Sequence, residues 1–137
     1  MPLKVRLKPN EKVIINGAVI SADERTATTV VLHNRASVLR SRDIMQPDDA
    51  TTPAKRIYFQ IMMMYIEPEN KDTFMDDYMS FMTDLINMTT LDEVRTSLLL
   101  IYRDVSAGEL YRALKTCRAI IKLEDELLAI GQQTAAE

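Results

Sequence analysis

The spacing of apolar residues changes from a period of two to a period near 3.6 around residue 50, and this change constrains the fold most. Residues 3–8 alternate between apolar and basic side chains, which is typical of a half-buried strand. Later apolar residues follow the three-and-four spacing of a helix face: Leu91, Val94, Leu98, Ile101 and Val105. The sequence therefore predicts an α+β fold, with a small antiparallel N-terminal β-sheet followed by a C-terminal bundle of about four helices.

Short strand-forming runs with turn sequences between them cover most of the first 45 residues. Asn16-Gly17 separates residues 13–15 from residues 18–20, and this pair is the strongest short hairpin signal because both positions accept positive φ. Further runs at residues 28–33 and 37–39 bring the predicted total to four or five strands. A sheet this small needs another layer on its apolar face.

The helical part is predicted to begin with Thr52 as N-cap and Pro53 as the first helical residue. This helix is expected to end near Ile66, and a second to span residues 71–88. Two capping-box sequences, at residues 90–93 and 106–109, are expected to open two more helices, the last ending near Ile130 before Gly131. We therefore expect a basic β-rich head (residues 1–45), an acidic helical body (52–131) and a frayed tail (132–137) within one compact unit.

Charge is divided unevenly along the chain. Residues 1–56 contain ten Lys and Arg against six Asp and Glu, whereas residues 57–137 contain seven against fourteen. This asymmetry is typical of a head with an anionic partner, but it also fits a solvated surface that is unevenly charged.

The residues expected of an enzyme or a metal site are absent from the sequence pattern. His33 and Cys117 stand alone, and the three glycines form no phosphate-binding loop. The acidic run at residues 124–126 is interpreted as a solvated helix face. We expect no cofactor, no metal and no catalysis.

The single cysteine favours a reducing compartment. The apolar run at residues 61–66 is too short to span a membrane. A cytoplasmic protein is therefore expected.

Six basic residues of the head form the candidate RNA-binding set. Their charges could contact phosphates, but no aromatic residue precedes Tyr58, so stacking platforms for bases are missing. Lys and Arg on a strand can alternatively serve only to prevent edge-to-edge pairing. The candidate residues are Lys4, Arg6, Lys8, Arg35, Arg40 and Arg42.

Methionines and other apolar residues of the first two predicted helices form the candidate partner or oligomer surface. Between Ile57 and Ile66 only Gln60 is polar, so this helix must be central in the core or covered by a second subunit. Methionines fill cores adaptably and also line surfaces that accept several partners, and both interpretations stay open. A homodimer or higher homo-oligomer is expected. The candidate residues are Ile57, Ile61, Met62, Met63, Met64, Met75 and Met79.

Three segments, LKPNEKVIINGAVI, NRASVLRSRDIM and TPAKRIYFQIMMMYIEPEN, make the chain resemble the FlbT family of alphaproteobacterial flagellar regulators. The resemblance implies a repressor that binds the 5′ untranslated region of flagellin mRNA, blocks translation and promotes decay. It also implies a helical protein partner of the FlaF type. An alternative is an adaptor or chaperone that acts through FlaF or flagellin, with indirect and even activating effects.

The head alone is also similar to the carbon storage regulator, a small β-rich dimeric RNA-binding protein. The similarity lies in the strand–turn–strand of residues 11–20 and in residues 38–44. It implies that Arg40 contacts RNA.

Overall fold

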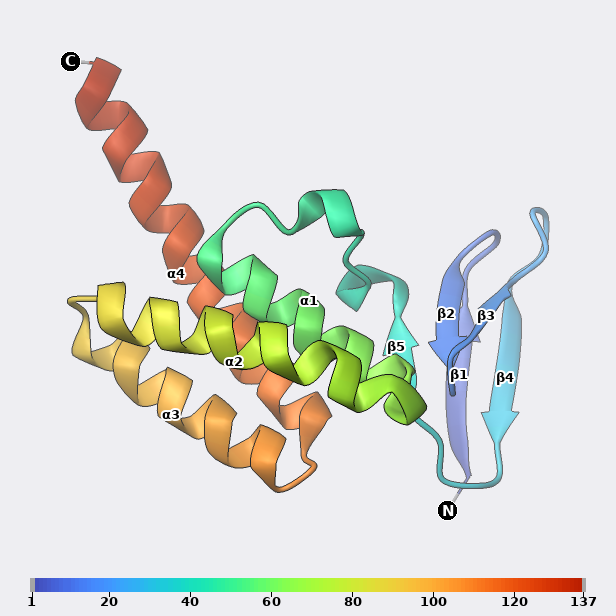
Figure 1. The fold of residues 1–137 in the computed structure, drawn as a ribbon. Helices are drawn as coiled ribbons and strands as arrows, with labels where there is room; N and C mark the ends of the chain where they lie inside the picture. Colours follow the sequence, from blue (N-terminus) through green and yellow to red (C-terminus); the bar gives the residue numbers. More distant parts are fainter. Residues whose placement is uncertain (1, 137) are drawn as a thin grey trace. The chain divides into compact units, whose positions relative to one another are not determined.

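The structure, a computed structural model, describes the backbone of residues 2–136 and the side chains of residues 2–131. Five strands precede four helices, which confirms the α+β class (Figure 1). The chain divides into two compact units. The β unit consists of Met1–Ile44 with Ile66–Glu69, and the helical unit consists of Met45–Tyr65 with Asn70–Glu137.

The strands of the β unit form two small antiparallel sheets rather than one. In the first, β1 (Leu3–Leu7) pairs with β4 (Thr28–Leu32). In the second, β2 (Lys12–Ile15) lies between β3 (Ala18–Ser21) and β5 (Val38–Arg40). Both sheets contribute to one apolar cluster, so each small sheet receives its covering layer from the other. The cluster's buried members are Val5, Leu7, Val13, Ile15 and Ala22.

The predicted hairpin between β2 and β3 is confirmed. Asn16 and Gly17 have φ values of 50° and 84°, as a two-residue turn of this kind requires. The Asn16 side chain accepts a hydrogen bond from the backbone N–H of Ser37 at 2.9 Å, which ties the turn to the segment before β5. A Cβ atom at Gly17 would lie 2.9 Å from the carbonyl oxygen of Ile66, so only glycine fits there.

The helical unit contains α1 (Pro53–Ile66), α2 (Lys71–Met88), α3 (Asp92–Ser106) and α4 (Leu110–Ala136). The predicted bounds of α1 and α2 are confirmed. Short 3-10 turns span Ser41–Asp43, Pro47–Asp49 and Pro68–Asn70.

Both predicted capping boxes are wrong. The N-cap of α3 is Leu91, without a side-chain hydrogen bond, because the Thr89 hydroxyl instead accepts a bond from the N–H of Leu91 at 3.2 Å. Ser106 is the last residue of α3 rather than a cap of α4.

The connection from α3 to α4 is a Schellman motif. Gly108 has a φ of 79°, its N–H donates to the carbonyl of Val105, and the N–H of Glu109 donates to the carbonyl of Asp104 at 2.7 Å. This glycine ends α3, as C′ glycines commonly do. Gly131, in contrast, does not end α4, whose backbone stays helical to Ala136 and so through most of the predicted tail.

The N-terminus of α1 is capped by a residue 70 positions away. Thr52 acts as the predicted N-cap, since its hydroxyl accepts a hydrogen bond from the N–H of Lys55 at 3.3 Å. The Glu124 carboxylate accepts bonds from the Thr52 hydroxyl and from the N–H of Ala54. Asp125 forms an ion pair with Lys55 at 4.0 Å. The interpretation of the 124–126 run as a solvated face is therefore wrong for Glu124, whereas Asp125 and Glu126 are exposed as predicted.

We expect Glu124→Ala to lower the stability of the helical unit by about 1–2 kcal/mol, because it removes an anionic cap from the positive end of α1. This corresponds to a decrease of roughly 3–6 °C in the thermal midpoint for a chain of this size. The matched control is Glu126→Ala, which removes the same group two residues along. Equal midpoints for the two variants, measured by circular dichroism, would show that the cap contributes nothing.

Candidate nucleic-acid interface

The first group of candidate cations lies along β1. Lys4 and Arg6 alternate with the buried residues Val5 and Leu7, and Lys8 continues the same alternation directly after the strand. All three side chains are exposed, on the side opposite the apolar cluster. Their intervals are two strand residues, about 6.6 Å. This group thus presents a straight row of three positive charges.

Lys4 and Arg6 have uncharged neighbours across the sheet, whereas the Glu11 carboxylate accepts a hydrogen bond from the backbone N–H of Lys8 at 2.9 Å. On the adjacent strand β4, the residues opposite Lys4 and Arg6 are Val31 and Thr29. Neither neighbour carries a negative charge that would compete with a phosphate for the cations.

The second group of candidate cations lies between β4 and the first 3-10 turn. Arg35 belongs to the connection between β4 and β5, Arg40 ends β5, and Arg42 lies in the turn Ser41–Asp43. All three are exposed. The Arg42 guanidinium lies 3.9 Å from the carboxylate of the buried Asp43, and its side chain remains 78% exposed. The six predicted cations thus form two groups, one along and just after β1 and the other before, in and after β5.

The predicted partner surface is corrected for four of its seven residues. Ile57, Ile61, Met62 and Met64 are all buried in a single chain, so they are core positions and present no surface to a partner. The all-round apolar character of α1 therefore needs no second subunit to explain it.

The other three candidates keep some accessibility. Met63 and Met75 are half-buried, whereas Met79 on α2 is exposed. On the same helix Tyr78, Met82 and Leu85 are buried, so this face of α2 is core. Burial raises the pKa of Tyr78, with smaller contributions from Tyr102 and Cys117.

The two residues considered for chemistry occupy unreactive positions. The Cys117 thiol is fully buried and donates a hydrogen bond to the carbonyl of Ala54 at 3.4 Å. Burial, and secondarily the Glu124 carboxylate, raises the pKa of this thiol above its usual range. His33 is exposed directly after β4. Within the described residues, no group of three or more His, Cys, Asp or Glu side chains could hold a metal ion.

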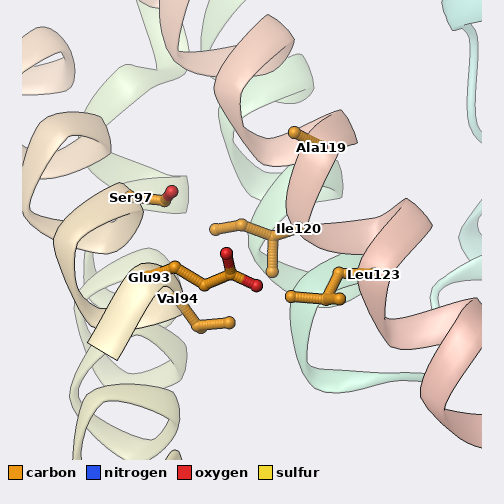
Figure 2. A pocket seen from close by; sticks show the side chains of 6 residues that line it. All are labelled: Glu93, Val94, Ser97, Ala119, Ile120 and Leu123. Atoms are coloured by element: carbon orange, nitrogen blue, oxygen red, sulfur yellow. The ribbon is translucent and has the colours of Figure 1, made fainter. Parts of the chain in front are cut away.

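Two adjoining hollows in the helical unit were not predicted. The first, about 170 Å³, lies between α3 and α4, and Figure 2 shows Glu93 and Val94 from α3 facing Ile120 and Leu123 from α4. The second, about 100 Å³, shares Val94, Ile120 and Leu123. The spacing of Leu123, Leu127 and Ile130, which continues the helix period from Ile120, is the sequence signal that could have indicated this region.

Among the helices that the structure describes, none combines the length and apolar character needed to cross a membrane.

Comparison with known proteins gives one consistent result. Residues 3–128 match the family described as "Flagellar protein FlbT". A "Probable flagellum biosynthesis repressor protein FlbT" of Caulobacter sp. (strain K31) is 44% identical, over 93% of this chain and 97% of its own length. The "Flagellum biosynthesis repressor protein FlbT" of Caulobacter vibrioides (strain ATCC 19089 / CIP 103742 / CB 15) is 42% identical over 93% and 90%. A relative in Agrobacterium fabrum is 32% identical over 98% and 89%. No solved structure matches the chain.

Proposed function

This chain belongs to the FlbT family of flagellar proteins, and from that premise we propose that it regulates flagellum biosynthesis after transcription. In this proposal the protein works in the cytoplasm without catalysis. It binds the 5′ untranslated region of flagellin mRNA through the cations of the β unit, which represses translation and promotes decay of the message. The printed names of the relatives, flagellum biosynthesis repressors, support the regulatory part.

The observation that carries the RNA-binding part is the exposure of all six candidate cations beside a compact apolar core. The strand alternation that buries Val5 and Leu7 necessarily turns Lys4 and Arg6 outward, so core and cationic row are two sides of one pattern. Because residues 1–57 contain no Phe, Tyr or Trp, phosphate contacts must supply most of the affinity. Binding of this kind depends strongly on salt.

The test is a titration of the full chain against a flagellin leader RNA at two salt concentrations, with the variant Arg40→Ala/Arg42→Ala. The salt slope is the slope of the logarithm of the binding constant against the logarithm of the salt concentration. Each lost phosphate contact on single-stranded RNA lowers its magnitude by about 0.7. The double variant should therefore lose about 1.4 in slope and roughly 25-fold in affinity at 0.1 M salt. The matched control, Lys115→Ala/Lys122→Ala, removes two exposed cations from α4 and should bind as the parent does. A folded arginine variant with the parent's affinity would contradict the proposal.

The charge of the remaining chain favours a second candidate function, an adaptor or chaperone that acts through a FlaF-type protein or flagellin. Residues 57–137 carry a net charge of −7, which repels RNA, and Met79 lies exposed on α2. This alternative is favoured if the parent binds no leader RNA at low salt yet retains a FlaF-type protein in a pull-down.

A further inference from the structure

Charge within the helical unit is divided between its helices rather than spread evenly. Residues 53–66 of α1 and 110–122 of α4 contain six Lys and Arg and no Asp or Glu. In contrast, α2 contains one cation and four carboxylates, and α3 contains two cations and three carboxylates. A segment whose net charge is negative therefore includes two stretches that carry only positive charge.

The cations of α4 form a stripe along one side of the helix. Tyr111, Lys115, Arg118 and Lys122 follow one another at intervals of four, three and four residues, which places them on one face. Tyr111, Lys115 and Lys122 are exposed, and Arg118 is half-buried. We name these four residues the α4 stripe.

The first residue of the α4 stripe is held by aromatic and cationic neighbours. The ring of Tyr111 lies 5.9 Å from the ring of Tyr65 on α1, measured between centroids. The ammonium group of Lys115 lies 4.9 Å from the centroid of the Tyr111 ring, a cation–π contact. Because Lys115 lies over it and Tyr65 beside it, this ring is not an open platform for stacking a base. It keeps 36% exposure, which leaves an apolar contact area at this end of the stripe.

Carboxylates limit the stripe at both ends. Before it, Arg112 lies 3.7 Å from the carboxylate of Asp104 and 3.9 Å from that of Glu109. After it, the exposed Asp125 and Glu126 follow. Between these groups Lys115 and Lys122 have no carboxylate partner among the described residues, and they lie about 10 Å apart along the helix. The available positive charge thus covers two helical turns.

We propose that the α4 stripe docks an acidic helix of a partner protein. Three carboxylates spaced three and four residues apart on that helix would face Lys115, Arg118 and Lys122, since both helices rise by about 1.5 Å per residue. An apolar side chain of the partner would cover Tyr111. Complementary charges of this kind choose the partner and speed association more than they raise affinity.

The limits of the stripe favour a protein helix over RNA. A polynucleotide carries a negative charge at every phosphate, so a strand that continued past two helical turns would meet carboxylates at either end. A protein helix can confine its acidic residues to those two turns. This docking is separate from RNA binding by the β unit and does not depend on it.

The test measures binding of a labelled synthetic peptide by fluorescence anisotropy. The probe is an alanine-rich peptide of about 20 residues with glutamates spaced three and four apart and one leucine, long enough to form a helix. The full chain should bind it, and Lys115→Ala/Lys122→Ala should weaken binding by about 2- to 30-fold at low salt, as loss of two exposed charge pairs implies. The reversal Lys115→Glu/Lys122→Glu should bind the same peptide with lysines in place of glutamates more tightly than the parent does.

The matched control removes the same amount of charge from the β unit. Lys4→Ala/Arg6→Ala should keep the parent's affinity for the glutamate peptide while binding flagellin leader RNA more weakly. Lys115→Ala/Lys122→Ala should show the opposite pattern, with RNA binding unchanged. A parent that binds no RNA would contradict the proposed function and leave the peptide result intact.

Circular dichroism separates loss of the stripe from loss of folding. Both variants should keep the parent's helix content, and if Lys115→Ala/Lys122→Ala unfolds, Lys115→Gln/Lys122→Gln repeats the measurement. The proposal is overturned if the parent does not bind the glutamate peptide, if the folded α4 variant binds it as tightly as the parent, or if the β1 variant loses it equally. Weaker RNA binding by the α4 variant would assign the stripe to RNA, and a parent dimer that this variant splits would assign it to a second copy. Either result also overturns the proposal.

Discussion

Replacing Lys4, Arg6 and Lys8 together with alanine is expected to weaken binding to a flagellin leader RNA roughly 100-fold at 0.1 M salt, and only about 4-fold at 0.5 M salt. Lys4 and Arg6 are exposed on β1 and Lys8 is exposed directly after it, so each can reach a phosphate. Each contact with single-stranded RNA contributes about 0.7 to the salt slope, and the triple variant should lose about 2. The fold should be kept, because exposed substitutions usually change stability by no more than about 0.5 kcal/mol each.

The control for this variant keeps the charges and changes the side chains. Lys4→Arg/Arg6→Lys/Lys8→Arg presents the same three positive charges, so its salt slope should match the parent's. Fluorescence anisotropy at four salt concentrations gives the salt slope of the alanine variant, the control variant and the parent. Equal slopes for the alanine variant and the parent would show that β1 makes no phosphate contact. The second group, Arg35, Arg40 and Arg42, would then be the only candidate left in the β unit.

The features that the sequence predicted well depend on short stretches of chain. Asn16-Gly17 specifies its hairpin through the φ values of two adjacent residues. Thr52 and Pro53 specify the start of α1 through a side-chain cap and a fixed φ. The exposure of Lys4 and Arg6 follows from the alternation of β1 alone. In each case the controlling contacts lie within a few residues.

The features that the sequence missed depend on residues far apart. The pairing of β1 with β4 and of β2 with β5 produces two sheets, and no local pattern distinguishes this from one sheet. The Glu124 cap joins positions 70 residues apart. The Ser106–Glu109 capping box failed because Gly108 with positive φ ends α3, and both motifs share the same residues. The two hollows beside α4 form only when α2, α3 and α4 pack together.

The methionines show the same limit most clearly, since neighbouring residues in one run have different environments. Met64 is fully buried, Met63 is half-buried, and Met79 is 39% exposed on the next helix. Composition predicts the same role for all three.

We expect Met64→Ala to destabilise the chain by about 2–5 kcal/mol, because it removes a buried side chain and leaves a cavity. For a chain of this size the thermal midpoint should fall by roughly 6–15 °C.

The matched control is Met79→Ala, which makes the same chemical change at an exposed helix position. Alanine has a higher helix propensity than methionine and no buried contact is lost, so the midpoint should stay within about 2 °C of the parent's. Thermal unfolding by circular dichroism at one protein concentration compares the three proteins directly. Similar midpoints for Met64→Ala and the parent would mean that Met64 is not core, and the assignment of α1 as a central helix would fail. A large decrease for Met64→Ala alone would support Met64 as a core residue of α1.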